Sequence, residues 1–362
     1  MRKIGISIYP EQSGIEKNIE YLNKTAKLGY DVLFTSWVHM DEQTFKNSLP
    51  IYKQVLKKAH DLNFYIIMDV NESVFKYLNI EYTDYKIFDD YKINCLRLDC
   101  PLLPETIAMS SYNSFNIDIQ LNMSNNDSLI NCVFDYQPIF DRIQGAHNFY
   151  PLKNSALPLD FFFDSSQRFK DFALNTMAFV GSHVGDESSA RGNRECVTLE
   201  IQRNMTINTQ AKILFATNLI DWVVIGNAFA SDEELTKLAQ VSKHFISIDI
   251  PESTKITTEE ENLLLEMLHF RRGDISSVFI RSTQGREKFK EVKMPAHNTK
   301  KEYKIGDVAI LNDLAGHYKN EVHIFLQDYI DEKGEYNFIF NLEEQIYLLD
   351  FILPWSKFRF RK

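Results

Sequence analysis

Strand-like runs alternate with helix-like stretches over the first two-thirds of the chain, and this alternation limits the fold more than any other feature. Eight β-branched or alternating runs read as strands, and a helix or a long connection follows each of them. They are residues 3–9, 31–36, 64–70, 95–99, 117–122, 142–148, 177–182 and 222–227. This order predicts an α/β fold, a (β/α)8 TIM barrel. The alternative is a doubly wound open sheet. No GxGxxG follows the first strand and no P-loop occurs, which disfavours the nucleotide-binding versions of that sheet.

The helical stretches carry their own boundary signals. The stretch 14–29 keeps apolar residues at helical spacing and ends at Gly29, which predicts a C-cap. In the stretch 230–245, Ser231 precedes Glu234 by three residues, which predicts a capping box at the start of a helix.

The sequence pattern changes after residue 248. A polar connection leads into a helical stretch at 258–270, and short runs separated by turn signals then predict strands at 277–282, 307–312, 321–329, 336–341 and 347–355. We therefore predict a barrel domain of the catalytic type over 1–248. A smaller, mostly-β domain with one leading helix is predicted over 249–362.

Charge and composition exclude several classes of protein. The formal net charge of -10 argues against general binding of nucleic acid or anionic membranes, although a local arginine-lined pocket remains compatible with it. No run approaches the ~20 apolar residues that cross a bilayer, and the apolar part of the N-terminus is too short for a signal peptide. The four cysteines show no CxxC and no zinc-like pairing with histidine, which favours thiols in a reducing compartment over a metal site. We expect a cytoplasmic protein without nucleic-acid or membrane partners.

The run 94–101, "NCLRLDCP", places two charges in a predicted strand. Strands of a parallel barrel are covered on both faces, so Arg97 and Asp99 should point into the lumen, while the alternating leucines face the helices. Buried charges cost several kcal/mol unless they are paired. The pair therefore predicts a site near the carboxyl end of the strand, and a purely structural ion pair is the alternative.

Polar residues recur at the ends of the neighbouring strands, namely Ser36, Asp69, Asp99, Asn122, His147 and Asn148. Such a ring is typical of the catalytic mouth of a barrel. We predict that Asp69, Asp99, Asn122 and His147 share one pocket. As alternatives, Asp69 could cap the following helix and Asn122 could tie down its loop. Tyr150, beside these groups, suits packing against a sugar ring.

A series of short motifs spans nearly the whole chain in a specific order: "GISIY", "LFTS", "LRLD", "HNFYP", "AFVGS", "TLEIQR" and "IGNAFAS", then "RRGDIS" and "GDVAILND". In order and spacing they resemble a family that has a TIM barrel followed by a cyclophilin-like β domain. The characterised branch of that family is the 6-phospho-N-acetylmuramidase group of glycoside hydrolases.

The resemblance implies an enzyme of peptidoglycan recycling. Such enzymes need no cofactor and split a 6-phosphorylated N-acetylmuramyl–N-acetylglucosamine disaccharide that a phosphotransferase system has imported. Glycosidases commonly use two carboxyl groups, which we expect among Asp69, Asp99 and Glu200. Arginine binds phosphate and carboxylate in a planar fork, so Arg97, Arg191 and Arg203 are candidates for anion binding. The other predicted substrate-binding residues are Gln120, Asn122, His147, Asn148, Tyr150 and Arg281. A homodimer is left open.

The chain departs from the pattern of that family at three places. Gln120 stands where the family usually has a glutamate, and an amide cannot act as a carboxylate acid or base. The stretches "LKNSALP" after "HNFYP" and "ECV" before "TLEIQR" also differ. One alternative is therefore a paralogue that binds a phosphosugar without cleaving it. Another is a different barrel reaction, such as an aldolase or isomerase, but no predicted strand offers the lumen-facing lysine of a Schiff-base aldolase.

Overall fold

The computed structural model describes residues 1–189 and 195–362. The chain divides into two compact units, Met1–Val241 and Ser242–Lys362. The boundary expected at 248/249 would cut through strand β9 (Ile246–Asp249). This strand pairs in parallel with β17 (Lys357–Arg361) and therefore belongs to the second unit.

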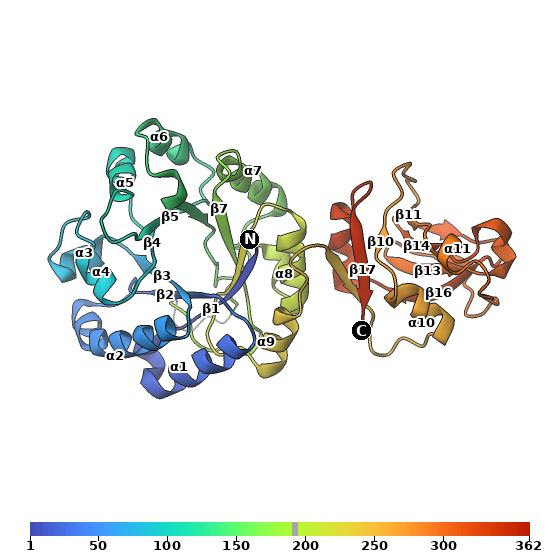
Figure 1. The fold of residues 1–362 in the computed structure, drawn as a ribbon, viewed down its shortest axis with the longest axis horizontal. Coiled ribbons are helices and arrows are strands. Elements are labelled where there is room, and N and C mark those ends of the chain that lie inside the picture. Colours follow the sequence, from blue (N-terminus) through green and yellow to red (C-terminus); the bar gives the residue numbers. More distant parts are fainter. Residues whose placement is uncertain (190–194) are drawn as a thin grey trace. The chain divides into compact units, whose positions relative to one another are not determined.

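The first unit is a closed barrel of eight parallel strands (Figure 1). Each strand pairs with its neighbours in sequence, and β1 pairs with β8 to close the ring. The strands are β1 (Lys3–Ser7), β2 (Val32–Ser36), β3 (Tyr65–Val70), β4 (Cys95–Leu98), β5 (Asp118–Asn122), β6 (Ile143–Ala146), β7 (Asn175–Val180) and β8 (Trp222–Ile225). This confirms the predicted (β/α)8 barrel.

Helices surround the barrel in Figure 1. The α-helices are α1 (Pro10–Lys27), α2 (Glu42–Asp61), α3 (Glu72–Leu78), α4 (Lys86–Asp90), α5 (Pro104–Ser110), α6 (Leu129–Asp135), α7 (Leu159–Lys170), α8 (Ile207–Ala216) and α9 (Asp232–Ala239). Short 3₁₀ helices are η1 (Phe140–Arg142) and η2 (Glu200–Gln202). Gly29 follows α1 with φ +82°, a left-handed conformation that favours glycine. Ser231 and Glu234 form the expected capping box of α9. Within the described residues, no helix is long and apolar enough to cross a membrane.

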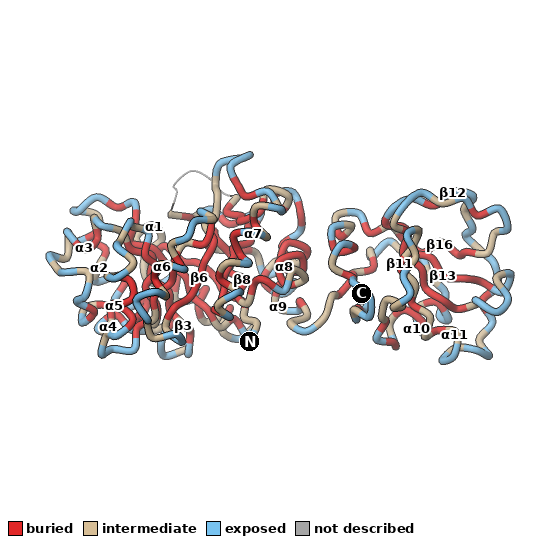
Figure 2. The backbone as a smooth tube through the Cα atoms, turned by 90° about the horizontal axis from the view of Figure 1, so that it is seen from above, coloured by how far each residue is buried: buried red, intermediate tan, exposed pale blue. Residues whose placement is uncertain are grey.

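Alternation along the barrel strands decides which side chains fill the lumen. The lumen cluster consists of Val32, Phe34, Ile67, Cys95, Ala146, Met177, Phe179, Trp222 and Val224. Arg97 follows Cys95 by two residues and shares its face, whereas Leu96 and Leu98 are buried on the other face, toward the helices. These strands are mostly buried (red in Figure 2). The predicted inward direction of Arg97 is confirmed.

The second unit is a mostly-β domain, as predicted, but the strand β9 precedes its first helix, α10. Its helices are α10 (Thr258–Leu265), α11 (Gly285–Lys288), η3 (Asp313–Tyr318) and η4 (Glu343–Phe351). One sheet has the order β10-β17-β9 and another has the order β11-β14-β13-β16, while β12 pairs with β15. These strands are β10 (His269–Phe270), β11 (Phe279–Ser282), β12 (Glu302–Tyr303), β13 (Asp307–Leu311), β14 (Val322–Phe325), β15 (Tyr329–Ile330) and β16 (Tyr336–Asn341).

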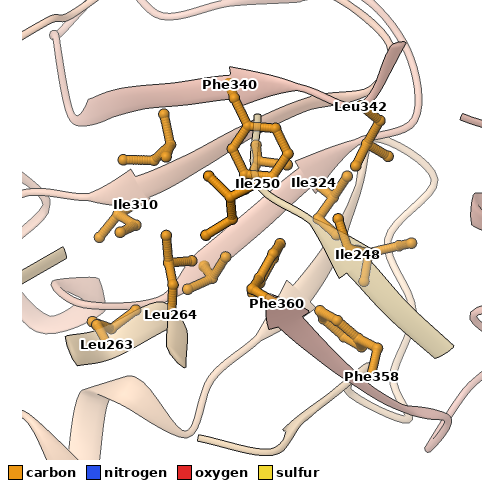
Figure 3. Close-up of a cluster of buried hydrophobic side chains, with 14 of the residues drawn as sticks. Ile248, Ile250, Leu263, Leu264, Ile310, Ile324, Phe340, Leu342, Phe358 and Phe360 are labelled. Atoms are coloured by element: carbon orange, nitrogen blue, oxygen red, sulfur yellow. The ribbon is translucent and has the colours of Figure 1, made fainter. Parts of the chain in front are cut away.

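The prediction of a strand at 347–355 is wrong. Residues 343–351 form the 3₁₀ helix η4, which buries Leu348 and Leu349 at successive positions, a pattern that an alternating strand with one covered face does not give. The strand lies later, at β17, where Phe358 and Phe360 alternate with charged residues. Both phenylalanines pack with Ile248 of β9 in the core of this unit (Figure 3).

Candidate active site

A hollow of about 270 Å³ lies at the carboxyl-terminal mouth of the barrel. Carboxylates and an arginine line it together with aromatic rings: Phe34, His39, Asp69, Arg97, Asp99, Asn148, Phe149, Tyr150, Pro151, Phe179 and Ser189. Asp69 comes from β3, Asp99 follows β4, and Asn148 follows β6. Because the strands of such a barrel end at the same face, loops far apart in sequence meet here.

Arg97 connects the charged groups of this hollow. Its Nη1 lies 2.6 Å from Oδ1 of Asp69 and 3.6 Å from Oδ1 of Asp99. Its Nη2 donates a hydrogen bond to Oδ1 of Asn148. The Asp69 carboxylate also accepts a hydrogen bond of 3.2 Å from the Ser36 hydroxyl. The guanidinium therefore fixes groups from β3, β4 and the segment after β6 relative to one another.

The two carboxylates differ in their surroundings. Asp69 is buried, and burial raises its pKa above the usual range; the charge of Asp99 adds to this effect, whereas Arg97 and Ser36 oppose it. The side chain of Asp99 is 41% exposed. A deep carboxyl group therefore lies beside an accessible one, and pairs of carboxyl groups in different surroundings are used as acid and base by many enzymes.

Aromatic rings form the apolar part of the hollow. Phe34 lies 5.0 Å from Phe179 and 6.3 Å from Phe149 between ring centroids, each pair edge to face. Tyr150 follows Phe149 and also lines the hollow, so four consecutive residues of the "HNFYP" motif, 148–151, reach the site. Rings and an amide side by side suit a sugar, which has apolar faces and a hydroxyl-rich edge.

Two of the four residues that were predicted to share this pocket lie elsewhere. His147 is fully buried, and its ring nitrogens lie 3.0 Å from the Ser124 hydroxyl and 2.8 Å from the Ser166 hydroxyl. Burial lowers the pKa of His147 to about 3, so the ring is neutral and structural in its contacts. Asn122 lines a neighbouring hollow, and its Oδ1 accepts a hydrogen bond from the Ser124 backbone N–H.

Glu200 and Arg203 hold a loop together and do not line the hollow. The Glu200 carboxylate accepts hydrogen bonds from the backbone N–H groups of Asn154 and Ala156, at 2.9 and 3.0 Å. Arg203 binds Glu200 at 2.6 Å and donates to the backbone carbonyl of Tyr150. The Arg203 contact and the two backbone donors lower the pKa of Glu200 against the effect of burial. These groups support the segment that carries Tyr150.

Two further arginines from the sequence prediction are not part of the described mouth. Arg281 belongs to the second unit, where it lies 3.0 Å from the buried Glu321, which Arg286 also contacts. Arg191 lies outside the residues that the structure describes.

Gln120 lies in the lumen, opposite Arg97 in the β4–β5 register, and is fully buried. Neither its Oε1 nor its Nε2 has a hydrogen-bond partner among the described residues. It does not line the hollow as described. A buried amide without partners is costly, so this position is unusual for a side chain that serves packing alone.

Sequence reasoning missed several residues that line the hollow. Phe34 and Phe179 carry a usable signal, because both lie on the lumen face of strands near their carboxyl ends. His39 has a left-handed backbone, with φ +70°, in the turn between β2 and α2, and nothing in the sequence marks it. Ser189 also lies in a loop without a pattern.

In the described part of the chain, no group of three or more His, Cys, Asp or Glu side chains is placed to hold a metal ion. The four cysteines are free thiols. Cys95 and Cys196 are buried, and Cys100 and Cys132 are partly exposed.

The fold and the mouth define the class: a (β/α)8-barrel protein with an enzyme-type site at the carboxyl ends of its strands, followed by a smaller β domain. Residues 4–240 match the family described as 6-phospho-N-acetylmuramidase, N-terminal, and residues 246–361 match the corresponding C-terminal family. The chain therefore belongs to the 6-phospho-N-acetylmuramidase family, which confirms the resemblance found in its motifs. The family name denotes a glycosidase of a phosphorylated muramic sugar.

Two solved structures share this two-domain fold over the whole chain. An uncharacterized protein from B. cereus is 34% identical, with a TM-score of 0.91, and the match covers 100% of this chain and 99% of that one. A conserved protein of unknown function from Enterococcus faecalis is 22% identical, with a TM-score of 0.73, and the match covers 99% and 96% of the two chains; it shows the shared fold. No curated protein matches the sequence.

Proposed function

We propose that this protein is a glycosidase that cleaves 6-phospho-N-acetylmuramyl–N-acetylglucosamine in the cytoplasm, as a step of cell-wall recycling. The observation that carries the proposal is the mouth of the barrel. There, Asp69 and Asp99 flank the guanidinium of Arg97 beside a wall of aromatic rings. Family membership supplies the class of substrate.

The spacing of the carboxylates supports this chemistry. Because both Oδ1 atoms are measured from the same Nη1, at 2.6 and 3.6 Å, they are no more than about 6 Å apart. Retaining glycosidases place their two carboxyl groups about 5–5.5 Å apart, whereas inverting enzymes leave about 6.5–9.5 Å for a water molecule. This upper limit lies below the inverting range and includes the retaining one, so we propose a retaining reaction.

The roles follow from accessibility. Asp99 is the exposed carboxyl group, so it is the one that can protonate the leaving oxygen and later deprotonate a water molecule. Asp69 lies deep in the hollow, where Arg97 supplies the positive charge that lets a buried carboxylate carry a negative one. We assign Asp69 the second role: it attacks the anomeric carbon of the sugar, or it stabilises the positive charge that develops on the sugar ring.

The test is to incubate the purified protein with the 6-phosphorylated disaccharide and with its unphosphorylated form. We expect cleavage of the phosphorylated compound, and a loss of about 10²–10⁴-fold in rate in Asp99→Asn. If the native protein cleaves neither compound, at compound concentrations that shift the melting temperature of the protein, the hydrolase proposal is rejected.

A second candidate is a protein that binds the phosphorylated disaccharide without cleaving it. Gln120 favours it, because this buried amide without partners stands where the family usually has a glutamate. The binder predicts a thermal shift with the phosphorylated disaccharide and no turnover, and a gain of turnover in Gln120→Glu. The hydrolase predicts turnover in the native protein and no such gain.

A further inference from the structure

A second hollow, of about 420 Å³, lies between the loops that follow β4 and β5. Its lining residues are Leu98, Asp99, Cys100, Pro101, Leu102, Ile107, Leu121, Asn122, Asn125, Asp127 and Leu129. Asp99 also lines the first hollow, so the two cavities meet at the accessible carboxylate. The volume of the second hollow is within the range of about 300–1,000 Å³ that small-molecule sites occupy.

The base of this second hollow is apolar. Leu98, Ile107 and Leu121 are buried there, and Leu102 and Leu129 are partly exposed. These side chains offer apolar contacts, which the faces of a pyranose ring or an acetyl methyl group can use.

The polar rim of the second hollow carries negative charge and amides. Asp99 and Asp127 are exposed, and none of the described side chains that line this hollow is a lysine, an arginine or a histidine. A phosphate or a carboxylate would therefore be repelled here. The first hollow also contains two carboxylates, Asp69 and Asp99, but unlike the second it has a guanidinium, that of Arg97. Of the two cavities, only the first therefore has a guanidinium that can bind an anion.

Asn122 provides a hydrogen-bond donor to this cavity. Its Oδ1 accepts a hydrogen bond of 2.9 Å from the Ser124 backbone N–H, which fixes the amide group. The Nδ2 of the same amide has no partner among the described residues, so it is available to a carbonyl or hydroxyl oxygen. An oriented donor above an apolar base is a common way to hold an uncharged sugar.

We propose that the second hollow is the binding site for the uncharged leaving sugar, an N-acetylhexosamine without phosphate. The inference rests on the proposed function and adds the residues that hold the leaving sugar. The phosphorylated sugar lies in the first hollow, the scissile bond lies beside Asp99, and the neutral sugar lies against Leu102 and Asn122.

The test compares two substrates that share the phosphorylated sugar. One is the phosphorylated disaccharide, and the other is 6-phospho-N-acetylmuramyl fluoride, whose leaving group is too small to fill the second hollow. Leu102→Trp fills the hollow. It should lower kcat/KM for the disaccharide relative to the fluoride by on the order of tenfold or more. Leu103→Trp is the matched control, because Leu103 is 71% exposed and does not line either hollow; it should leave this ratio unchanged.

A charge variant tests the direction of the substrate. We expect the native protein to discriminate against a disaccharide that carries its phosphate on the leaving sugar, and Asp127→Asn to weaken that discrimination. The Oδ1 that accepts from the Leu129 N–H is kept in this variant, so the start of α6 is preserved.

The outcomes separate the two proposals. If the native protein cleaves both substrates and Leu102→Trp leaves their ratio unchanged, the second hollow is not the leaving-group site, while the glycosidase proposal stands. If the native protein cleaves neither substrate, the proposed function fails and this inference fails with it.

Discussion

Nη1 of Arg97 lies 2.6 Å from Oδ1 of Asp69 in the mouth of the barrel, and both residues are almost excluded from solvent. The ion pair joins adjacent strands, β3 and β4, which are in register at these two residues. Neither charge has an equally close alternative partner of opposite sign among the described residues, since Asp99 is 3.6 Å from the same nitrogen. The pair therefore sets both the stability and the electrostatics of the site.

Replacing Arg97 by methionine should destabilise the barrel by about 3–5 kcal/mol, because it leaves the Asp69 carboxylate buried without its partner. Urea-induced unfolding measures the loss. The double variant Arg97→Met/Asp69→Leu, which removes both charges, should recover much of it. A single variant as stable as the native protein would show that Asp69 does not depend on this pair.

Asp99→Asn should reduce activity strongly while leaving the fold intact. Its side chain is 41% exposed and its distance to Arg97 is long for an ion pair, so the charge adds little to stability. The turnover number and the melting temperature distinguish the two effects. Asp90→Asn, an exposed carboxylate at the end of α4, is the control and should change neither. Full activity of Asp99→Asn would remove Asp99 from the mechanism.

Gln120→Leu should keep or raise the free energy of unfolding, because it removes a buried amide whose two polar atoms have no partner among the described residues. Gln120→Glu should lower it, since a carboxylate at this depth is costly. Chemical denaturation of both variants measures the difference. A loss of kcat in Gln120→Leu without any change in stability would instead show that the amide takes part in the reaction.

Acid should destabilise the barrel through His147. Its pKa is lowered from 6.5 to about 3 by burial, so below pH 6.5 the unfolded chain takes up a proton that the folded state does not. Stability is then fully present above pH 6.5 and falls toward pH 3, by up to about 1.4 kcal/mol per pH unit.

The slope of unfolding free energy against pH, between pH 6 and 4, should therefore be smaller in His147→Gln than in the native protein. His183→Gln changes an exposed imidazole and is the matched control. Equal slopes in the native protein and His147→Gln would contradict the assignment of a buried neutral ring.

The barrel could be predicted because its strands repeat one simple pattern. Strands covered on both faces give apolar runs. Some of the helices between them also begin at a residue whose side chain caps the helix, as at Asp41, Asn71 and Ser231. The strand predicted at 347–355 shows the limit of this reasoning. An apolar run of that length fits a strand or a buried helical turn equally well, and only its packing distinguishes the two.

The candidate site was predictable where strand alternation determines direction. Arg97 faces the lumen because it lies two residues after Cys95, and alternate residues of a strand share a face. Asp69 lies beside Arg97 because the two residues are directly opposite each other in the pairing of β3 with β4. Side chains in loops follow no such rule. His147 turns toward Ser166 of α7, and Glu200 accepts from the backbone of Asn154, contacts that depend on elements far away in sequence.

The parallel pairing of β9 with β17 has a consequence for how the protein is made. Every strand of the barrel is synthesised before the second unit is begun, whereas β17, the middle strand of the three-stranded sheet of that unit, is synthesised after both of its neighbours, β9 and β10. Until Phe358 and Phe360 arrive, Ile248 lacks the side chains that cover it in the finished core. We therefore expect the incomplete second unit to expose apolar surface around Ile248 during synthesis, which makes it prone to aggregation until β17 is added.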